Sequence, residues 1–231
     1  VPFPCVLKPL GLSASRGVIR ADDRGQFLAA FARIRCLLRA PDVRKMRDEA
    51  TEWIHVESYI SGVEVAVEGI LTQGRLQTLA LFDQPDPLEG PYFEETIYVT
   101  PSRLAAEAQQ AVVETVARAV EALGLWHGPM HAEVRLNDEG VWMLDMAARP
   151  IGGLCARALR FNGGMPLEEL ILRHARGEPV DQLTRETAAS GVMMIPIPHA
   201  GIFETVENLQ EAAETPGVVD IEITAKVKQE L

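Results

Sequence analysis

Apolar and polar residues alternate along several parts of the chain, which is the pattern of strands with one buried face. The clearest examples are residues 63–71 and 75–82, separated by a short turn. Two other stretches repeat their apolar residues at helical spacing: residues 26–38, and a longer stretch that we expect to begin with an N-cap at Thr100 and to end at Gly124. Consecutive strands joined by short turns pair antiparallel. The pattern therefore predicts an α+β fold built on antiparallel sheets.

Residues 130–149 predict a β-hairpin whose two faces differ in character. We expect a three-residue loop that ends in glycine. This register places Glu133 directly across from Asp145 on one face. It places Trp142 and Leu144 on the opposite, apolar face.

The facing carboxylates of Glu133 and Asp145 indicate a cation site. Two carboxylates directly opposite on neighbouring strands repel each other, and a divalent cation removes that conflict because Mg²⁺ prefers oxygen ligands. Arg149 has the same parity as Asp145 and is placed to hold a phosphate that bridges to the metal. The alternative is a solvated face on which Arg135 and Arg149 neutralise the acids.

Length and charge narrow the possible functions. The chain has 231 residues, 47% of them hydrophobic, so it can bury a substantial core. The formal net charge of −11 argues against binding to nucleic acids or anionic membranes. No apolar run reaches the length of about 18 residues that a membrane span needs. Three widely spaced cysteines are typical of a reducing cytosol, so we expect a cytoplasmic protein.

A lysine at the end of a short apolar strand lies next to a flexible loop. Lys8 is followed by GLSASR at residues 11–16, which offers glycines, hydroxyl groups and backbone N–H groups to the oxygens of a polyphosphate. The loop is not a Walker A loop, because no Gly-Lys-Ser/Thr sequence leads into a helix. A surface hairpin with a solvated lysine would have the same pattern.

Two further segments carry candidate nucleotide contacts. Residues 56–60 end a strand, and an exposed strand end can present one acceptor and one donor to the edge of an adenine. In the next strand, alternation places valines inward and Glu64 and Glu68 outward. Glu64 could then accept hydrogen bonds from ribose hydroxyls. An ordinary strand end and a wet outer face are the alternative explanations.

The order of these segments resembles that of the ATP-grasp ligases. The matching sequences are VLKP, the Gly/Ser loop, VESYISGVEVAVEG and, the most specific, HAEVRL followed by WMLDMAARPIGG. The resemblance implies an ATP-grasp fold, in which two antiparallel-sheet subdomains with helices clamp ATP. We expect a small subdomain at residues 1–73, a large one with the metal hairpin at residues 74–190 and a truncated C-terminal extension at residues 191–231.

The resemblance also implies roles for individual residues. Glu133 and Asp145 match the two acids that hold Mg²⁺ or Mn²⁺. Lys8 and Arg149 match cations that contact the transferring phosphate and act in catalysis. The positions that match ATP contacts are Lys8, the phosphate-loop residues Ser13, Ser15 and Gly17, the adenine-hinge residues Glu57, Ser58 and Ile60, the adenine walls Val6 and Leu144, and the ribose acid Glu64.

One departure from the family pattern concerns the metal. Most of the superfamily has an asparagine two residues after the second acid, as a further metal ligand, where this chain has Ala147. The Ala-Ala-Arg sequence resembles instead the L-amino-acid ligase branch. The departure puts the geometry of a second metal in doubt.

The reaction that the resemblance implies is ATP-dependent ligation of a carboxylate to an amine through an acylphosphate. The partners would be small molecules, with His131 and Arg135 as candidate contacts to the acyl substrate, and a homodimer is an option. Alternatives are a biotin-carboxylase-like or purine-pathway enzyme and a non-catalytic nucleotide-binding module. Full-length relatives carry a further N-terminal domain with another phosphate-contacting lysine, so we expect this chain to be a piece of a longer protein.

Overall fold

The computed structural model describes residues 1–86, 90–93, 96–197 and 199–230. Contacts within the chain divide it into two compact units, Val1–Met194 and Ile195–Leu231. The first unit contains a three-stranded sheet, a six-stranded sheet and a short two-stranded sheet, all antiparallel. The predicted α+β class is therefore confirmed. None of the helices among the described residues combines the length and apolar character needed to cross a membrane.

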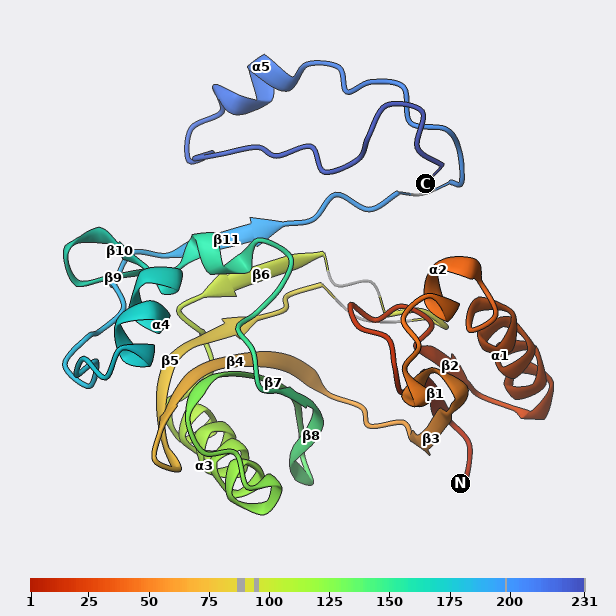
Figure 1. The fold of residues 1–231 in the computed structure, drawn as a ribbon, viewed down its shortest axis with the longest axis horizontal. Coiled ribbons are helices and arrows are strands. Elements are labelled where there is room, and N and C mark those ends of the chain that lie inside the picture. The colour runs from red at the N-terminus through yellow and green to blue at the C-terminus, as the bar shows by residue number, and fades with distance from the viewer. Residues whose placement is uncertain (87–89, 94–95, 198, 231) are drawn as a thin grey trace. The chain divides into compact units, whose positions relative to one another are not determined.

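The small sheet has the strand order β2-β1-β3 (Figure 1). Its strands are β1 (Cys5–Pro9), β2 (Ile19–Ala21) and β3 (Ile54–Ser58). Helix α1 (Arg24–Leu37) packs on one face of it through Ala30 and Ile34. The helix begins close to its predicted start because the Asp23 side chain caps it, accepting a hydrogen bond from the backbone N–H of Gln26 at 2.9 Å. Two short helices lie between α1 and β3: α2 (Pro41–Arg44) and the 3-10 helix η1 (Glu49–Glu52).

The large sheet has the strand order β11-β6-β5-β4-β7-β8. Its strands are β11 (Ser190–Met193), β6 (Ile97–Thr100), β5 (Arg75–Asp83), β4 (Val63–Thr72), β7 (Gly128–Asn137) and β8 (Gly140–Ala147).

Both predicted subdomain boundaries require correction. The boundary after Gln73 is wrong because β4 pairs with β5 and β7 and so belongs to the large sheet. The small subdomain therefore ends before Val63. The extension expected from Gly191 begins after Met194, because β11 pairs with β6 in the large sheet.

Different parts of the chain cover the two faces of the large sheet. Helix α3 (Ala106–Leu123) packs on one face, and its buried residues are Val112, Val116 and Val120. Residues 151–180, with α4 (Leu167–Ala175), cover part of the opposite face. The short elements of this segment are η2 (Cys155–Ala158), β9 (Arg160–Phe161), η3 (Asn162–Gly164) and β10 (Met165–Pro166).

Helix α3 begins later than predicted. Thr100 is not its N-cap but the last residue of β6, where it pairs with Ser190. An irregular segment at residues 101–105 separates the strand from the helix. The helix begins at Ala106 instead. Its predicted end is confirmed, since Gly124 has the left-handed conformation of a helix C-terminus.

The second unit holds one short helix among its described residues, α5 (Leu209–Ala213). Residues 202–206 and 218–224 contain alternating apolar residues but form no strand, and the β-type pairing in the described part of this unit is an isolated bridge between Ile202 and Glu230. Alternation alone does not make a strand when no neighbouring strand buries the apolar face. Val219, for example, is 99% exposed.

Candidate active site

The hairpin of β7 and β8 turns one residue more tightly than predicted. Asn137 pairs with Gly140, so the loop has two residues instead of three. A β-bulge between Glu133 and Val134 then shifts the register back by one. As a result Glu133 lies opposite Asp145, as predicted.

The tighter loop changes which side chains of β8 face the core. Val141 and Met143 pack against the core that α3 covers. Trp142 lies on the other face, where its Nε1–H donates to Oδ1 of Asn137 at 3.2 Å. The predicted apolar position of Trp142 is therefore wrong, because a register shift of one residue moves a side chain to the opposite face. Leu144 is the extra residue of the bulge and is not part of that core.

Glu133 and Asp145 form a pair of oxygen donors of the kind that Mg²⁺ prefers. Asp145 is exposed and Glu133 partly buried, so the pair can be reached from solvent. Among the described residues no group of three or more His, Cys, Asp or Glu side chains is arranged to hold a metal ion. Two carboxylates leave most coordination positions of Mg²⁺ open, and the phosphate oxygens of a nucleotide can fill them. The pair therefore suits a metal–nucleotide complex.

His131 lies between two carboxylates. Its Nδ1 is 2.6 Å from Oε1 of Glu68, and its Nε2 is 3.2 Å from Oε1 of Glu133. Burial by itself would lower the pKa of His131, but the hydrogen bonds to both carboxylates and their charges outweigh burial and raise the pKa to about 9. The protonated ring then donates to both acids. Neither ring nitrogen is left for the substrate contact predicted for His131, which stays a prediction.

Glu68 is a residue whose place the sequence did not reveal. Alternation placed it on a wet outer face, but it is only 1% exposed because residues 151–161 cover that part of the sheet. Burial raises the pKa of Glu68, while the hydrogen bond and charge of His131 lower it. The backbone N–H of Ile151 also donates to this carboxylate, and the charge of Arg149 acts on it.

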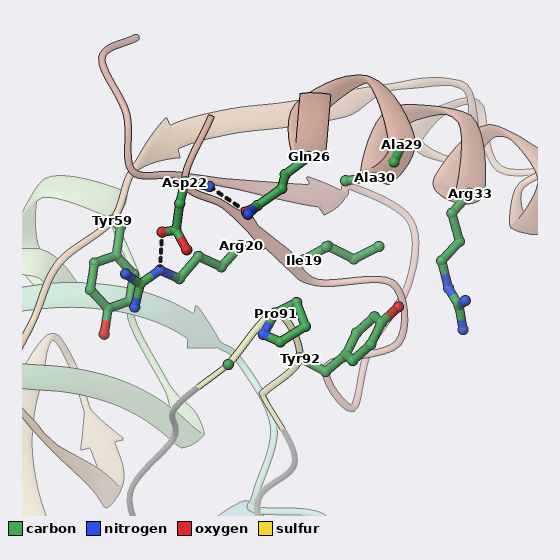
Figure 2. A pocket seen from close by; sticks show the side chains of 11 residues that line it. Ile19, Arg20, Asp22, Gln26, Ala29, Ala30, Arg33, Tyr59, Pro91 and Tyr92 are labelled. Carbon is green, nitrogen blue, oxygen red and sulfur yellow. Dashed lines mark hydrogen bonds and ion pairs between the residues drawn. The ribbon is translucent and has the colours of Figure 1, made fainter. Parts of the chain in front are cut away.

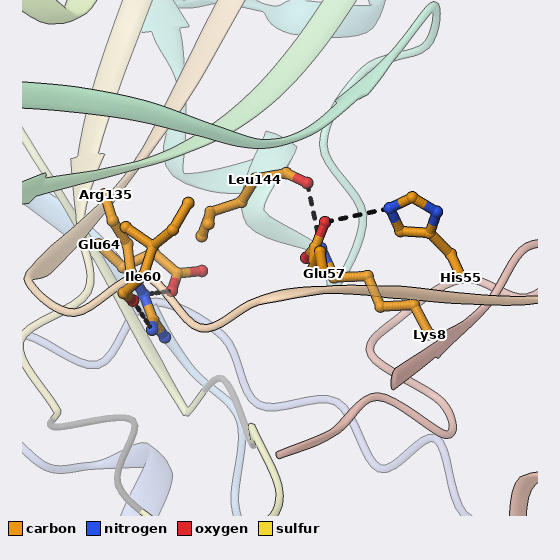
Figure 3. A network of polar contacts seen from close by, with 7 residues as sticks. All are labelled: Lys8, His55, Glu57, Ile60, Glu64, Arg135 and Leu144. Carbon is orange, nitrogen blue, oxygen red and sulfur yellow. Dashed lines mark hydrogen bonds and ion pairs between the residues drawn. The ribbon is translucent and has the colours of Figure 1, made fainter. Parts of the chain in front are cut away.

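Lys8 connects the small sheet to the hairpin (Figure 3). Its ammonium group forms an ion pair with Glu57 and donates to the carbonyl oxygen of Leu144 at 3.2 Å. Glu57 also lies 3.4 Å from Nε2 of His55. Leu144 precedes Asp145, so the ammonium group is hydrogen bonded to the backbone that leads into the second acid of the pair. Both Lys8 and Glu57 are partly exposed, and such an ion pair can exchange its partners.

A buried ion pair joins β4 to β7. Nε of Arg135 is 2.8 Å from Oε2 of Glu64, and both side chains are almost fully buried. The second arm of the guanidinium, Nη1, donates to the carbonyl oxygen of Ile60 at 2.7 Å (Figure 3). The wet-face explanation of Glu64 is therefore wrong. The predicted roles of Glu64 in ribose binding, Ile60 in adenine binding and Arg135 in substrate binding stay predictions.

The remaining hinge positions lie at the end of β3. Ser58 is exposed there and pairs with Cys5 of β1, while Val6 pairs with Glu57. Val6 alternates with Cys5 and Leu7, which face α1, so it lies on the sheet face away from the helix. This placement suits the adenine wall predicted for Val6.

The predicted phosphate loop is a tight turn between β1 and β2. The carbonyl oxygens of Ser13 and Ser15 accept hydrogen bonds from the backbone N–H groups of Arg16 and Val18. Gly17 has a φ of +84°, and a Cβ there would lie 2.8 Å from Cδ2 of Leu37. Packing therefore accounts for the glycine by itself, without a ligand.

Arg149 lies just after β8 and is exposed. Its Nη1 donates to the carbonyl oxygen of Pro150 at 3.0 Å, a local contact that leaves the guanidinium accessible. Its positive charge lowers the pKa of Glu68, against the larger raising effect of burial. The role predicted for Arg149 beside the acids stays a prediction.

A separate cavity of about 840 Å³ borders the hinge (Figure 2). It lies between α1, β2 and residues 90–92, and Tyr59 forms part of its wall. The guanidinium of Arg20 stacks over the ring of Tyr59 at 4.1 Å, and Arg20 also pairs with Asp22. None of the site residues predicted from the sequence lines this cavity, so the candidate site is the hairpin with Lys8.

Comparison with known proteins identifies the family of the chain. A family model described as "ATP-grasp domain" matches residues 1–158. The chain is 27% identical over 183 residues to the alanine–anticapsin ligase of Bacillus subtilis (strain 168), covering 73% of this chain and 38% of that protein. It is 32% identical over 161 residues to carnosine synthase 1 of Gallus gallus, covering 68% of this chain and 17% of that protein.

A solved structure is also similar to the whole chain. The crystal structure of the L-amino acid ligase from Bacillus licheniformis matches with a TM-score of 0.75 and 25% identity, over 100% of this chain and 58% of that one. The chain thus spans less than two thirds of the length of each of these three proteins. Its fold and the extent of the family match lead to one conclusion: the chain belongs to the ATP-grasp family.

Proposed function

We propose that this chain is the nucleotide-binding part of an ATP- and Mg²⁺-dependent carboxylate–amine ligase. The observation that carries the proposal is the cross-strand pair Glu133 and Asp145, with the ammonium group of Lys8 hydrogen bonded to the residue before Asp145. Amino acids are the substrate class suggested by the names of the similar proteins, an alanine–anticapsin ligase and an L-amino acid ligase.

The reaction would proceed in two steps. A carboxylate oxygen of the first substrate attacks the γ-phosphorus of ATP, the bond to the β–γ bridging oxygen breaks, and ADP leaves. An amine nitrogen then attacks the carbonyl carbon of the acylphosphate, inorganic phosphate leaves, and the nitrogen loses a proton. The protein would contribute positioning and charge stabilisation in both the phosphoryl transfer and the acyl transfer.

Four residues of the site would hold the reacting groups. Glu133 and Asp145 would bind Mg²⁺, which neutralises charge on the phosphates. Lys8 would exchange Glu57 and the carbonyl of Leu144 for phosphate oxygens. Arg149, which is exposed just after β8, would contact the transferring phosphoryl group.

Calorimetry with a non-hydrolysable ATP analogue, with and without Mg²⁺, tests this proposal. Binding is measured rather than turnover, because the chain spans 38% of the alanine–anticapsin ligase. We expect Mg²⁺-dependent binding that the double variant Glu133→Ala/Asp145→Ala loses. The matched control is Asp138→Ala/Glu139→Ala, which removes two exposed acids from the turn of the same hairpin and should leave binding unchanged.

Two results would count against the proposal. Equal binding with and without Mg²⁺ in all variants would contradict the role of the carboxylates and favour a non-catalytic nucleotide-binding module. ADP release by the full-length protein that does not depend on added carboxylate and amine would contradict ligation itself.

A further inference from the structure

Glu68 is a fully buried carboxylate that the proposed reaction does not use directly. It lies in the middle of β4, directly opposite His131 of β7, and is 1% exposed. Burying a charged group is costly unless hydrogen bonds and an opposite charge compensate. Glu68 has both, through the 2.6 Å contact to Nδ1 of His131 and the backbone N–H of Ile151.

The contacts of Glu68 continue to the candidate metal site. His131 uses its second nitrogen to donate to Oε1 of Glu133 at 3.2 Å, and Glu133 faces Asp145. The β-bulge that creates this facing pair begins at Glu133. Glu133 therefore lies where the ladder is irregular, and the hydrogen bond from His131 restrains its side chain there.

Glu68 also acts on the segment that follows β8. The carboxylate of Glu68 accepts a hydrogen bond from the backbone N–H of Ile151, which lies two residues after Arg149. One buried carboxylate thus holds a side chain on β7 and the backbone next to the candidate phosphate-binding arginine. Hydrogen-bond partners behind metal ligands orient those ligands in general, and their loss costs metal affinity.

We infer that Glu68 is a positioning residue, which holds His131 so that its Nε2–H orients the carboxylate of Glu133 toward a divalent cation. The inference rests on the proposed function, because it takes Glu133 as a metal ligand. Glu68 itself contacts neither the cation nor the substrates.

The test compares Glu68→Gln with wild type, using Mn²⁺ as the probe. Electron paramagnetic resonance measures the dissociation constant of Mn²⁺ in the presence of saturating non-hydrolysable ATP analogue, and urea unfolding measures stability. We expect Glu68→Gln to weaken Mn²⁺ binding by about 10- to 100-fold, the usual effect of losing a partner behind a metal ligand. Binding of the analogue without metal should stay at the wild-type value.

His174→Gln is the matched control. His174 is also buried, at 4% exposure, and hydrogen bonds through Nε2 to Oγ1 of Thr72, in the same strand as Glu68. It has no contact with the carboxylate pair, so His174→Gln should lower stability without changing the affinity for Mn²⁺. A Glu68→Gln variant that behaves in the same way would overturn the inference and leave Glu68 with a structural role only.

Comparing Glu133→Ala/Asp145→Ala with Glu68→Gln distinguishes a failure of the inference from a failure of the proposed function. If Glu133→Ala/Asp145→Ala binds Mn²⁺ as wild type does, the metal site itself is wrong. If that double variant loses Mn²⁺ but Glu68→Gln does not, only the inference fails. If Glu68→Gln does not unfold cooperatively, His131→Gln replaces it, because it removes the residue that links Glu68 to Glu133. A His131→Gln variant that binds Mn²⁺ with wild-type affinity would equally overturn the inference.

Discussion

The ammonium group of Lys8 has two partners that a polyphosphate could replace. One is the partly exposed carboxylate of Glu57 and the other a carbonyl oxygen, that of Leu144. A phosphate group carries more charge than either and accepts several hydrogen bonds. The sequence placed Lys8 at the end of a strand beside a loop, and the structure adds that it reaches the hairpin that carries the acids.

Replacing Lys8 should reduce nucleotide affinity. We expect Lys8→Met to weaken binding of a non-hydrolysable ATP analogue by about 10- to 100-fold, because a hydrogen bond to a charged group contributes roughly 1.5–3 kcal/mol. Calorimetry measures the change. Lys45→Met, which removes an exposed lysine after α2 in the same subdomain, is the control. Equal affinities of the two variants would contradict a phosphate contact for Lys8.

At the scale of elements, the link from the small sheet to β4 depends on a close approach of two backbone segments. Gly62 lies just before β4 with a φ of +130°, and a Cβ on it would come within 2.0 Å of the carbonyl oxygen of Leu136 in β7. Only glycine fits both the conformation and the contact. Alternation in the sequence identified the two neighbouring strands, but not this approach.

A pair of alanine substitutions separates the two requirements at Gly62. Gly140 has a similar φ of +137° and open space around it, so Gly140→Ala should cost only the backbone strain, about 1–3 kcal/mol. Gly62→Ala adds the clash with the backbone of Leu136 and should cost more than about 4 kcal/mol in the free energy of unfolding. Urea unfolding measures both. Equal losses of unfolding free energy in the two variants would mean that the backbone at Gly62 can shift away from Leu136 without an energetic cost.

For the whole molecule, pH sensitivity of the fold should come in part from His174. Burial lowers the pKa of His174, and the charge of the stacked His127 ring, 4.2 Å away, lowers it further. Above the pKa of about 6.5 that a histidine has in the unfolded chain, His174 is neutral in both the folded and the unfolded state. As the pH falls below that value the unfolded state binds the proton first, so stability decreases until the folded pKa is passed.

We therefore expect the free energy of unfolding to fall more between pH 7.5 and pH 5.5 in wild type than in His174→Gln. Urea unfolding at the two pH values measures both differences. The side chain of glutamine does not titrate, so the variant lacks this contribution while its other groups are unchanged. If both proteins lose the same stability, His174 does not contribute to acid sensitivity.

Sequence and structure each determined a different part of this site. The order of the motifs and the alternation in β7 and β8 were enough to predict the ATP-grasp fold and the pairing of Glu133 with Asp145. The pairing was predicted from a loop of the wrong length, and a bulge in β8 compensated for the error. Local patterns identify the residues that share a strand face, but a bulge depends on packing between strands.

Only the tertiary structure decided which polar residues on that face are buried. Alternation placed Glu64 and Glu68 together and left both on a wet surface, whereas each has less than a tenth of its surface exposed. Residues 151–161 cover Glu68, and Arg135 pairs with Glu64. A strand's sequence defines its two faces through its period of two, but not the distant segment that packs on each of them.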